Sequence, residues 1–267
     1  MMLKKYYIIL IGLIFLTINS MPIFAFDLSE QNSDELVIYE AKEITDEKVL
    51  FERAINGVIE GDVVPKVKVF LQKDGSEVDT KNVKQYVTVQ KIKTTKNLKS
   101  GATRSLYKQV SISLLSSTAL QDLNEGWDST YGVKATCTAW YETITLPVKD
   151  LFGNIINYRT YYRYVKIDGK WIKYDSTLSL KNSQIGFRHQ GTAAKSDGTI
   201  YGGLSIDRTY TVANGYPTSG TTYSIYPNTN GYYFSNDALG DQNLARMKVD
   251  ITKGGSTWNF TFLNMLD

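Results

Sequence analysis

Long runs in which apolar and polar side chains alternate constrain the fold of this chain most strongly. In residues 133–146, one set of alternate positions holds Val133, Ala135, Cys137, Ala139 and Tyr141, and the other holds Lys134, Thr136, Thr138 and Trp140. A period of two is typical of a β-strand with one face against a core. Similar runs cover residues 67–71, 86–93, 110–114 and 155–167. Many such strands separated by turn residues predict a mainly β fold, an antiparallel β-sandwich with Greek-key or jelly-roll-like connections.

A change of pattern near residue 100 predicts two regions. Residues 45–59 carry an apolar stripe at helical spacing behind a capping Thr45 or Asp46, so we expect a helix there. Residues 94–105 lose apolar side chains and contain Ser100-Gly101, which favours a linker. We therefore expect a small α+β region at 26–101, in part a leader, and the sandwich at 102–267.

Asp168-Gly169 lies between two alternating runs. Asp-Gly is a strong signal for a two-residue hairpin turn, because a type I′ turn needs positive φ at both central residues. We expect the chain to reverse at this point.

The first 25 residues have the pattern of a secretory signal peptide. Lys4 and Lys5 precede an apolar run over residues 8–18, and Ala25 is the expected cleavage position. No later stretch is apolar enough to span a bilayer, so we expect a secreted, extracellular protein with no integral membrane segment after signal removal. The single cysteine, Cys137, excludes an internal disulfide, so stability must come from the core.

The net charge of +3 hides a segregation of opposite charges. Residues 26–62 contain eleven acids and three bases, whereas residues 63–110 contain eleven bases and three acids. The acidic block either folds against the basic block, or masks a basic surface that concentrates anionic partners, or both blocks are ordinary solvated faces. No nucleic-acid recognition motif is present, so nucleic acid is not an expected partner.

Cys137 and His189 are the only members of their residue types and so form the only possible Cys–His pair. The run from Thr136 to Tyr141 resembles the Cys-Thr-Trp-Tyr stretch of CHAP-type cell-wall amidases, with Ala139 as an extra residue. The resemblance covers these six residues and implies Cys137 as nucleophile. His189 is the candidate base only as the sole histidine, because the run Phe187-Arg188-His189-Gln190-Gly191 departs from the family's pattern. The strand pattern indicates instead that Cys137 is a small buried hydrophobe.

Metal and cofactor sites are not expected. One His and one Cys leave a zinc site dependent on carboxylates. A loop holding Asn236, Asp237, Asp241 and Asn243 supplies oxygen ligands but lacks a known calcium-loop spacing, so turn chemistry is favoured. Scattered carboxylates leave acid–base hydrolysis open without nominating a pair.

Two groups of residues are candidates for binding. Tyrosines are concentrated in a stretch rich in Gly, Asn, Thr and Ser, a composition suited to recognition of sugars or peptides; they are Tyr201, Tyr210, Tyr216, Tyr223, Tyr226, Tyr232 and Tyr233. Lysines on the expected strands of the basic block form the second group, namely Lys66, Lys68, Lys91 and Lys93.

These features predict a secreted, non-enzymatic binding module for an anionic or carbohydrate-bearing target, such as a polysaccharide, teichoic acid or a cell-surface protein. Two alternatives remain open. The first is a cell-wall hydrolase that uses Cys137 and His189. The second is a toxin or bacteriocin-like effector in which the acidic segment 26–62 is a removable leader.

Overall fold

The computed structural model describes residues 34–61, 63–78, 80, 83–116, 131–237 and 240–266. The expected signal peptide lies outside the described residues. The elements in chain order are β1 (Glu35–Glu40), α1 (Glu47–Ile55), β2 (Pro65–Lys73), β3 (Ser76–Glu77), β4 (Val83–Asn97), β5 (Thr103–Ser116), β6 (Tyr131–Lys149), β7 (Ile155–Lys173), β8 (Ser179–Ala194), β9 (Ile200–Thr211), a short 3-10 turn (Ala213–Gly215), β10 (Thr222–Ile225), β11 (Tyr233–Phe234), β12 (Gln242–Lys253) and β13 (Ser256–Leu266).

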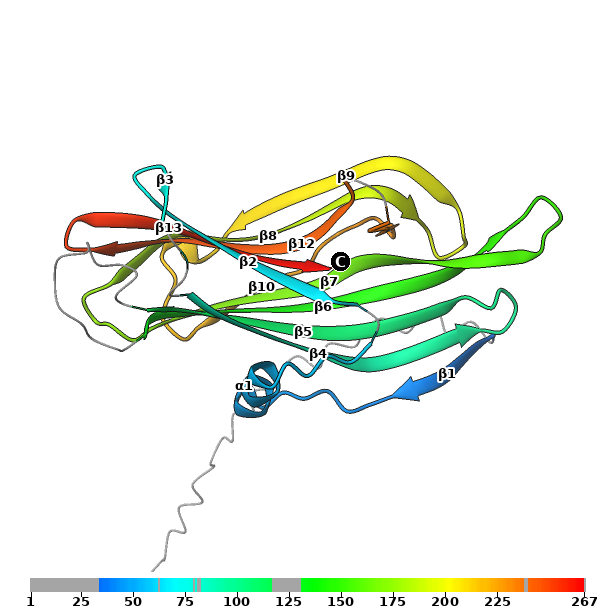
Figure 1. Ribbon diagram of the computed structural model, residues 1–267, viewed down its shortest axis with the longest axis horizontal. Coiled ribbons are helices and arrows are strands. Elements are labelled where there is room, and N and C mark those ends of the chain that lie inside the picture. Colours follow the sequence, from blue (N-terminus) through cyan, green and yellow to red (C-terminus); the bar gives the residue numbers. More distant parts are fainter. Residues whose placement is uncertain are drawn as a thin grey trace, which may run out of the picture. The chain divides into compact units, whose positions relative to one another are not determined.

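The strands form one antiparallel sheet that folds over onto itself. Its order is β1-β4-β5-β6-β7-β11-β8-β12-β13-β2-β3, with β10 beside β7 and β9 beside β8. Strands β12 and β2, which are far from β6 and β4 in this order, nevertheless contact them. Figure 1 shows β8, β12, β13 and β2 lying over β4 to β7. The mainly β, sandwich-like fold expected from the alternating pattern is confirmed.

The core lies between these two layers and takes the apolar positions of the alternating strands. On β6, Ala135, Cys137 and Tyr141 are at most 1% exposed, and they share one cluster with Trp171 of β7 and Met247 of β12. Because side chains alternate along a strand, the other face of β6 points away from this core. That outward face carries Lys134, Thr136, Thr138 and Trp140.

Helix α1 covers part of the outward face. Its Leu50 and Ala54 pack against Val110, Ile112 and Leu114 of β5. The Asp46 side chain caps the helix by accepting hydrogen bonds from the backbone N–H groups of Lys48 and Val49. The helix expected at residues 45–59 is therefore present in a shorter form.

Replacing the capping carboxylate is expected to lower stability modestly. Asp46→Ala leaves two backbone N–H groups without their acceptor and should reduce the free energy of unfolding by about 1 kcal/mol. Urea unfolding measures the change. Glu52→Ala is the matched control, because it removes another exposed acid, from within the helix, without touching the cap; an equal loss in both variants would contradict the capping role.

The linker expected at residues 94–105 is wrong. Strand β4 continues to Asn97 and β5 begins at Thr103, so only a short turn separates them. Thr94 and Ser105 face each other across the pair, with their buried hydroxyls 2.9 Å apart. The expected boundary at residues 101 and 102 falls in this turn, and strands from both sides of it belong to the same sheet.

The hairpin expected at Asp168-Gly169 is also wrong, because both residues lie inside the continuous strand β7. Gly169 pairs with Cys137 of β6. A Cβ at this position would lie 2.6 Å from Cδ1 of Ile185 and 3.2 Å from Cε of Met247. The glycine therefore provides space for the opposite layer and does not form a turn.

Candidate functional site

The structure does not bring Cys137 and His189 together through a hydrogen bond. The Cys137 thiol is buried, and Asn264 donates to its Sγ over 3.9 Å. Burial raises the pKa of Cys137 to about 12, which disfavours the thiolate that a nucleophile requires. His189 is fully buried, and its Nε2 accepts a hydrogen bond from the backbone N–H of Tyr164. This geometry supports the buried-hydrophobe interpretation of Cys137.

The four candidate lysines do not form one surface. Lys66 and Lys68 lie on β2, in the layer of β13. Lys91 and Lys93 lie on β4, in the other layer. The Lys91 ammonium sits over the rings of Tyr39 and Tyr107, and Lys93 pairs with Glu40 of β1 at 3.5 Å.

The described part of the acidic block folds against basic residues. Besides the pair of Glu40 with Lys93, Asp34 pairs with Lys99 and Glu43 pairs with Lys108, at 2.5 and 2.7 Å. Strand β1 joins the sheet beside β4. Of the three interpretations of the charge blocks, the structure supports mutual screening for residues 34–61.

The seven candidate tyrosines also fall into separate places. Tyr233 is buried, and its hydroxyl donates to Glu142 over 2.9 Å. The rings of Tyr201 and Tyr232 meet edge to face, with the ammonium of Lys195 over both. Tyr223 packs beside Trp171, whereas the exposed rings belong to Tyr210, Tyr216 and Tyr226. These positions do not make a single tyrosine surface.

The acidic loop near residue 240 is engaged in internal contacts. Asp237 pairs with Arg159 at 2.9 Å, and Asp241 accepts a hydrogen bond from Ser235. The buried side-chain amide of Asn243 forms a hydrogen bond with Nδ1 of His189 and donates another to the backbone carbonyl of Ser235. Within the described ranges, no group of three or more His, Cys, Asp or Glu side chains is placed to hold a metal ion.

A groove on the outward face of the β5–β6–β7 layer gathers polar side chains from distant parts of the sequence. We call it the Trp140 groove; it has a volume of about 170 Å³. Its floor is formed by Lys134, Thr136, Thr138 and Trp140 of β6 with Asp168 and Lys170 of β7. Register explains the grouping, because Thr138 stands opposite Asp168 and Thr136 opposite Lys170.

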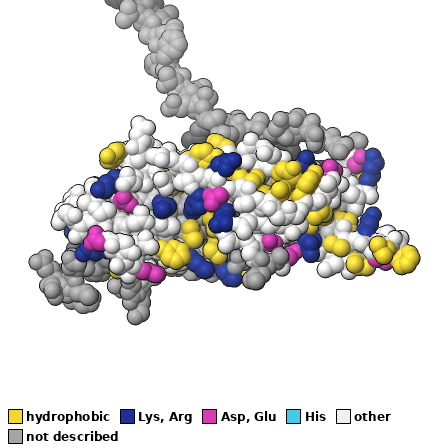
Figure 2. All heavy atoms as spheres, turned by 90° about the horizontal axis from the view of Figure 1, so that it is seen from above, with side chains coloured by type: hydrophobic (Ala, Val, Ile, Leu, Met, Phe, Trp, Pro, Cys, Tyr) yellow, Lys and Arg dark blue, Asp and Glu magenta, His cyan; other side chains and the backbone are white. Residues whose placement is uncertain are grey.

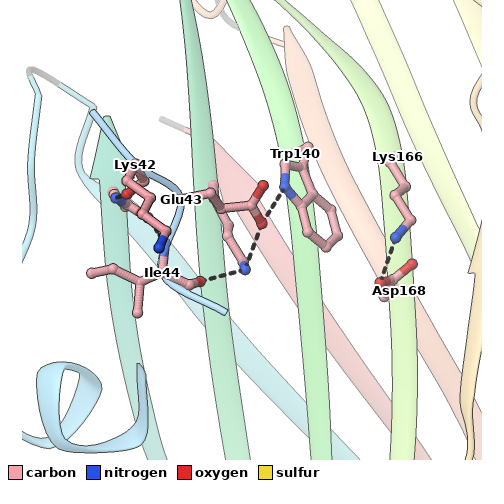
Figure 3. A network of polar contacts seen from close by, with 8 residues as sticks. Lys42, Glu43, Ile44, Trp140, Lys166 and Asp168 are labelled. Carbon is pink, nitrogen blue, oxygen red and sulfur yellow. Dashed lines mark hydrogen bonds and ion pairs between the residues drawn. The ribbon is translucent and has the colours of Figure 1, made fainter. Parts of the chain in front are cut away.

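One wall of the groove comes from the segment before α1 and from the helix itself. Thr45, Glu47 and Leu50 line this wall. Beside the groove, Glu43 accepts hydrogen bonds from Lys108 Nζ and from the Trp140 indole N–H, at 2.7 and 3.2 Å. Figure 3 shows Glu43 and Trp140 pointing toward each other, with the Lys166–Asp168 pair on the neighbouring strand. Glu47, in the first turn of α1, reaches Lys170 at 2.8 Å. On the other side, β10 places Thr222 beside Lys170.

The indole of Trp140 lies between two cations. The Nζ atoms of Lys108 and Lys166 are 5.1 and 4.4 Å from its ring centroid, on the strands to either side. Cations near an aromatic face are favoured by the ring quadrupole. Trp140 is only 8% exposed, so it holds lysines in place and offers little ring surface for stacking.

The groove carries a surplus of positive charge. Two carboxylates, Glu47 and Asp168, and three lysines, Lys108, Lys134 and Lys170, line it. Glu47 pairs with Lys170, and the residues just outside the lining, Lys166 and Glu43, pair with Asp168 and Lys108. Among the described residues, the third lysine of the lining, Lys134, has no ion-pair partner within 4 Å, and its ammonium sits over the ring of Phe51 at 4.7 Å.

The surroundings of Lys134 disfavour its charged form. Burial lowers the pKa of Lys134; Glu47 opposes this effect, and Lys170 adds to it. An anion beside Lys134 would stabilise its charged form. The hydroxyls of Thr136 and Thr138 face the same space, and neither has a hydrogen-bond partner in the part of the chain that the structure describes. The groove therefore offers a cation and free hydroxyls together.

Sequence reasoning identified the strand that forms the groove floor but not the groove. The alternation of Lys134, Thr136, Thr138 and Trp140 marked an outward face. The wall residues lie about ninety positions earlier, and only the docking of residues 43–50 onto β5 brings them near. The one signal in the sequence that indicated a binding surface here was the combination of threonine hydroxyls, lysine and tryptophan at the outward positions of a single strand.

Comparison with known proteins leaves the site to be interpreted from its own geometry. No protein-family model, curated protein or solved structure matches the chain. None of the helices in the described ranges has both the length and the apolar character needed to cross a membrane.

Proposed function

We propose that the chain is a non-enzymatic binding module whose Trp140 groove holds one unit of an anionic, hydroxyl-rich polymer. The observation that carries this proposal is the half-buried Lys134, which lacks an ion-pair partner among the described residues and stands beside two free threonine hydroxyls. A phosphate or carboxylate would pair with Lys134, and sugar or polyol hydroxyls would bond Thr136 and Thr138.

The size of the groove favours a chain segment over a complete small ligand. Pockets for drug-sized molecules usually measure about 300–1,000 Å³. A groove of about 170 Å³ is smaller and open, so it suits one residue of a longer molecule. Affinity would then grow through neighbouring contacts along the polymer. Teichoic acid and acidic polysaccharides have this chemistry, and both fit the expected export of the chain.

The ion pairs around the groove position its surface. Lys108 and Lys170 are held by Glu43 and Glu47 from the segment before α1 and its first turn, and Lys166 is held by Asp168 of its own strand. This bonding fixes the threonine-lined floor before a ligand arrives, which reduces the entropy lost on binding. The groove contains no thiol, and its carboxylates are engaged with lysines, so its arrangement suits recognition.

Calorimetric titration with soluble poly(glycerol phosphate) tests the proposal. Lys134→Gln should weaken binding about tenfold, because a hydrogen bond to a charged group contributes about 1.5–3 kcal/mol. Lys68→Gln, which removes the same charge from the other layer, is the matched control and should bind as the parent does. A neutral dextran should bind far more weakly than the phosphate polymer at low salt.

Two outcomes would contradict the proposal. Equal weakening by Lys134→Gln and Lys68→Gln would indicate diffuse charge attraction without a site. Unchanged affinity in Lys134→Gln would exclude the groove as the anion site.

A further inference from the structure

The turn between β6 and β7 carries the most exposed apolar side chains of the described residues. Leu151 is 102% exposed and Phe152 is 88% exposed. Figure 1 shows this hairpin extending past the neighbouring strands, and Figure 2 shows hydrophobic side chains gathered at the same end. We call residues 148–158 the hairpin tip. Turns normally expose Gly, Asn, Asp or Ser, so two large apolar side chains here need an explanation.

Hydrogen bonds hold the turn in a fixed form. Asp150 Oδ1 accepts from the backbone N–H groups of Phe152 and Asn154 at 2.9 and 2.8 Å, and Oδ2 accepts from the Asn154 side chain at 3.0 Å. The backbone closes with Asp150 N–H donating to the Asn154 carbonyl. Leu151 and Phe152 are therefore displayed on an ordered turn, and the Asp150 carboxylate is satisfied within it.

The hairpin tip is apolar on both faces. Ile155 and Ile156 are consecutive residues of β7, and they are 50% and 65% exposed. Successive strand residues point to opposite faces, so the two isoleucines project in opposite directions. Val148 and Tyr158 add exposed apolar surface on the two arms. A groove in a partner protein covers one face of a hairpin, whereas a fluid apolar medium surrounds both.

Basic and tyrosine side chains lie at or near the base of the hairpin tip. Lys99 of the β4–β5 turn and Lys149 and Arg159 of the hairpin line a hollow of about 460 Å³ that also includes residues of the β8–β9 turn. Lys195, the residue after β8, lies over the rings of Tyr201 in β9 and of Tyr232, the residue before β11. Apolar side chains flanked by tyrosine and lysine are typical of a segment at a membrane interface.

We propose that the hairpin tip inserts Leu151 and Phe152 into the interfacial zone of a lipid bilayer, independently of the Trp140 groove. The isoleucines behind the turn would follow into the headgroup and upper acyl region, with Tyr158 at the headgroup level. Insertion is shallow, in keeping with the ~5–10 Å depth of interfacial segments. The proposal requires no membrane-spanning element.

Charge makes a small contribution to this insertion. Lys99 and Arg159 are already paired with Asp34 and Asp237, at 2.5 and 2.9 Å. Lys149 is the one cation lining the hollow without an ion-pair partner in the described ranges. One unpaired lysine near an anionic surface strengthens binding roughly fivefold. Zwitterionic vesicles should therefore bind the tip, and anionic vesicles should bind it only severalfold more tightly.

A local fluorescent reporter tests the proposal in the full chain. The native Cys137 is 1% exposed and stays unlabelled, so Leu151→Cys can be labelled selectively with an environment-sensitive nitrobenzoxadiazole group. Tyr216→Cys provides the matched control, since Tyr216 is also strongly exposed at 71%. A reporter at the hairpin tip is needed because the apolar run at residues 8–18 can itself bind lipid, so binding of the whole chain to vesicles would not identify the tip. The probes are vesicles of phosphatidylcholine, with and without phosphatidylglycerol.

The expected result is a blue shift at position 151 that lipids with nitroxide-labelled acyl chains quench, with no shift at position 216. Phe152→Ser combined with Ile156→Ser should lower the partition coefficient reported at position 151 on the order of 100-fold. No shift at position 151 with either vesicle would overturn the proposal. A shift that depends on protein concentration without lipid would also overturn it, by identifying a second copy of the chain as the occupant.

Discussion

Lowering the pH from 7 to 4 is expected to reduce the free energy of unfolding by about 3 kcal/mol through His189 alone. Burial lowers the pKa of this imidazole from 6.5 to about 4 in the folded protein. The unfolded chain takes up the proton below pH 6.5, whereas the folded protein resists it until about pH 4. The unfolded state therefore binds more protons in this window, and stability falls as the pH falls.

The surroundings of His189 explain why the neutral ring is favoured. Its Nε2 accepts a hydrogen bond from the Tyr164 backbone N–H at 3.2 Å. Protonation of Nε2 would place a second N–H donor opposite the Tyr164 N–H, and the hydrogen bond would be lost. The ring stacks on Phe234 at 5.0 Å and lies 5.7 Å from Phe187. The Asn243 side chain contacts Nδ1 and stabilises the charged form, but desolvation is the larger effect.

Urea unfolding at a series of pH values measures this dependence. His189 is the only histidine in the chain, so no other imidazole titrates in the same range. His189→Gln removes the titrating group, and the difference in slope between the two proteins isolates its contribution from that of the carboxylates. Equal slopes between pH 6.5 and 4 would show that His189 is not buried in its neutral form.

Gly169→Val is expected to destabilise the protein by about 3 kcal/mol, the upper part of the range for overpacking a filled core. A Cβ at residue 169 would lie 2.6 Å from Ile185 Cδ1, and the Ile185 side chain is fully buried. The valine methyl groups would add to this conflict and force the two layers apart. Thermal and urea unfolding both measure the loss.

Two further variants separate overpacking from a general effect of valine in a strand. Gly202→Val is the control, because Gly202 lies in β9 with no atom within 4 Å of a built Cβ; this variant should be neutral or slightly stabilising. Adding Ile185→Ala to Gly169→Val should recover part of the loss, since the two residues compete for one space. Strictly additive losses in the double variant would refute the proposed packing.

The parts of the fold that the sequence predicted are those in which local patterning and tertiary burial agree. On β6, the alternate positions Val133, Ala135, Cys137, Ala139 and Tyr141 are all at most 1% exposed, as the alternating pattern indicated. Helix α1 was predictable because its cap, Asp46, and its apolar stripe are both local signals.

The errors came from residues whose role depends on another layer or strand. Asp168-Gly169 has the composition of a turn, yet Gly169 is required by Ile185, sixteen positions later. Residues 94–105 carry few apolar side chains, yet Thr94 and Ser105 pair through their hydroxyls, so polar residues continue the strands there. A single sequence does not reveal these partners.

The candidate site was predictable only in its residue types. The sequence predicted that lysines bind an anionic target, but it assigned this role to Lys66, Lys68, Lys91 and Lys93. The fold places these four lysines in two layers. Lys134 was seen only as an outward residue of a strand. Its significance comes from Glu43, Glu47 and Asp168, which lie nearby and pair with other lysines, and this balance exists only in the folded protein.

The indole N–H resonances of the tryptophans, recorded by NMR during titration with poly(glycerol phosphate), test the central claim most directly. Trp140 lines the groove and its N–H donates to Glu43, whereas Trp171 and Trp258 are buried in the core between the layers. Trp140→Phe assigns the signal. The account predicts that the Trp140 resonance shifts in a saturable manner while those of Trp171 and Trp258 stay in place; saturable binding that leaves Trp140 unmoved would contradict it.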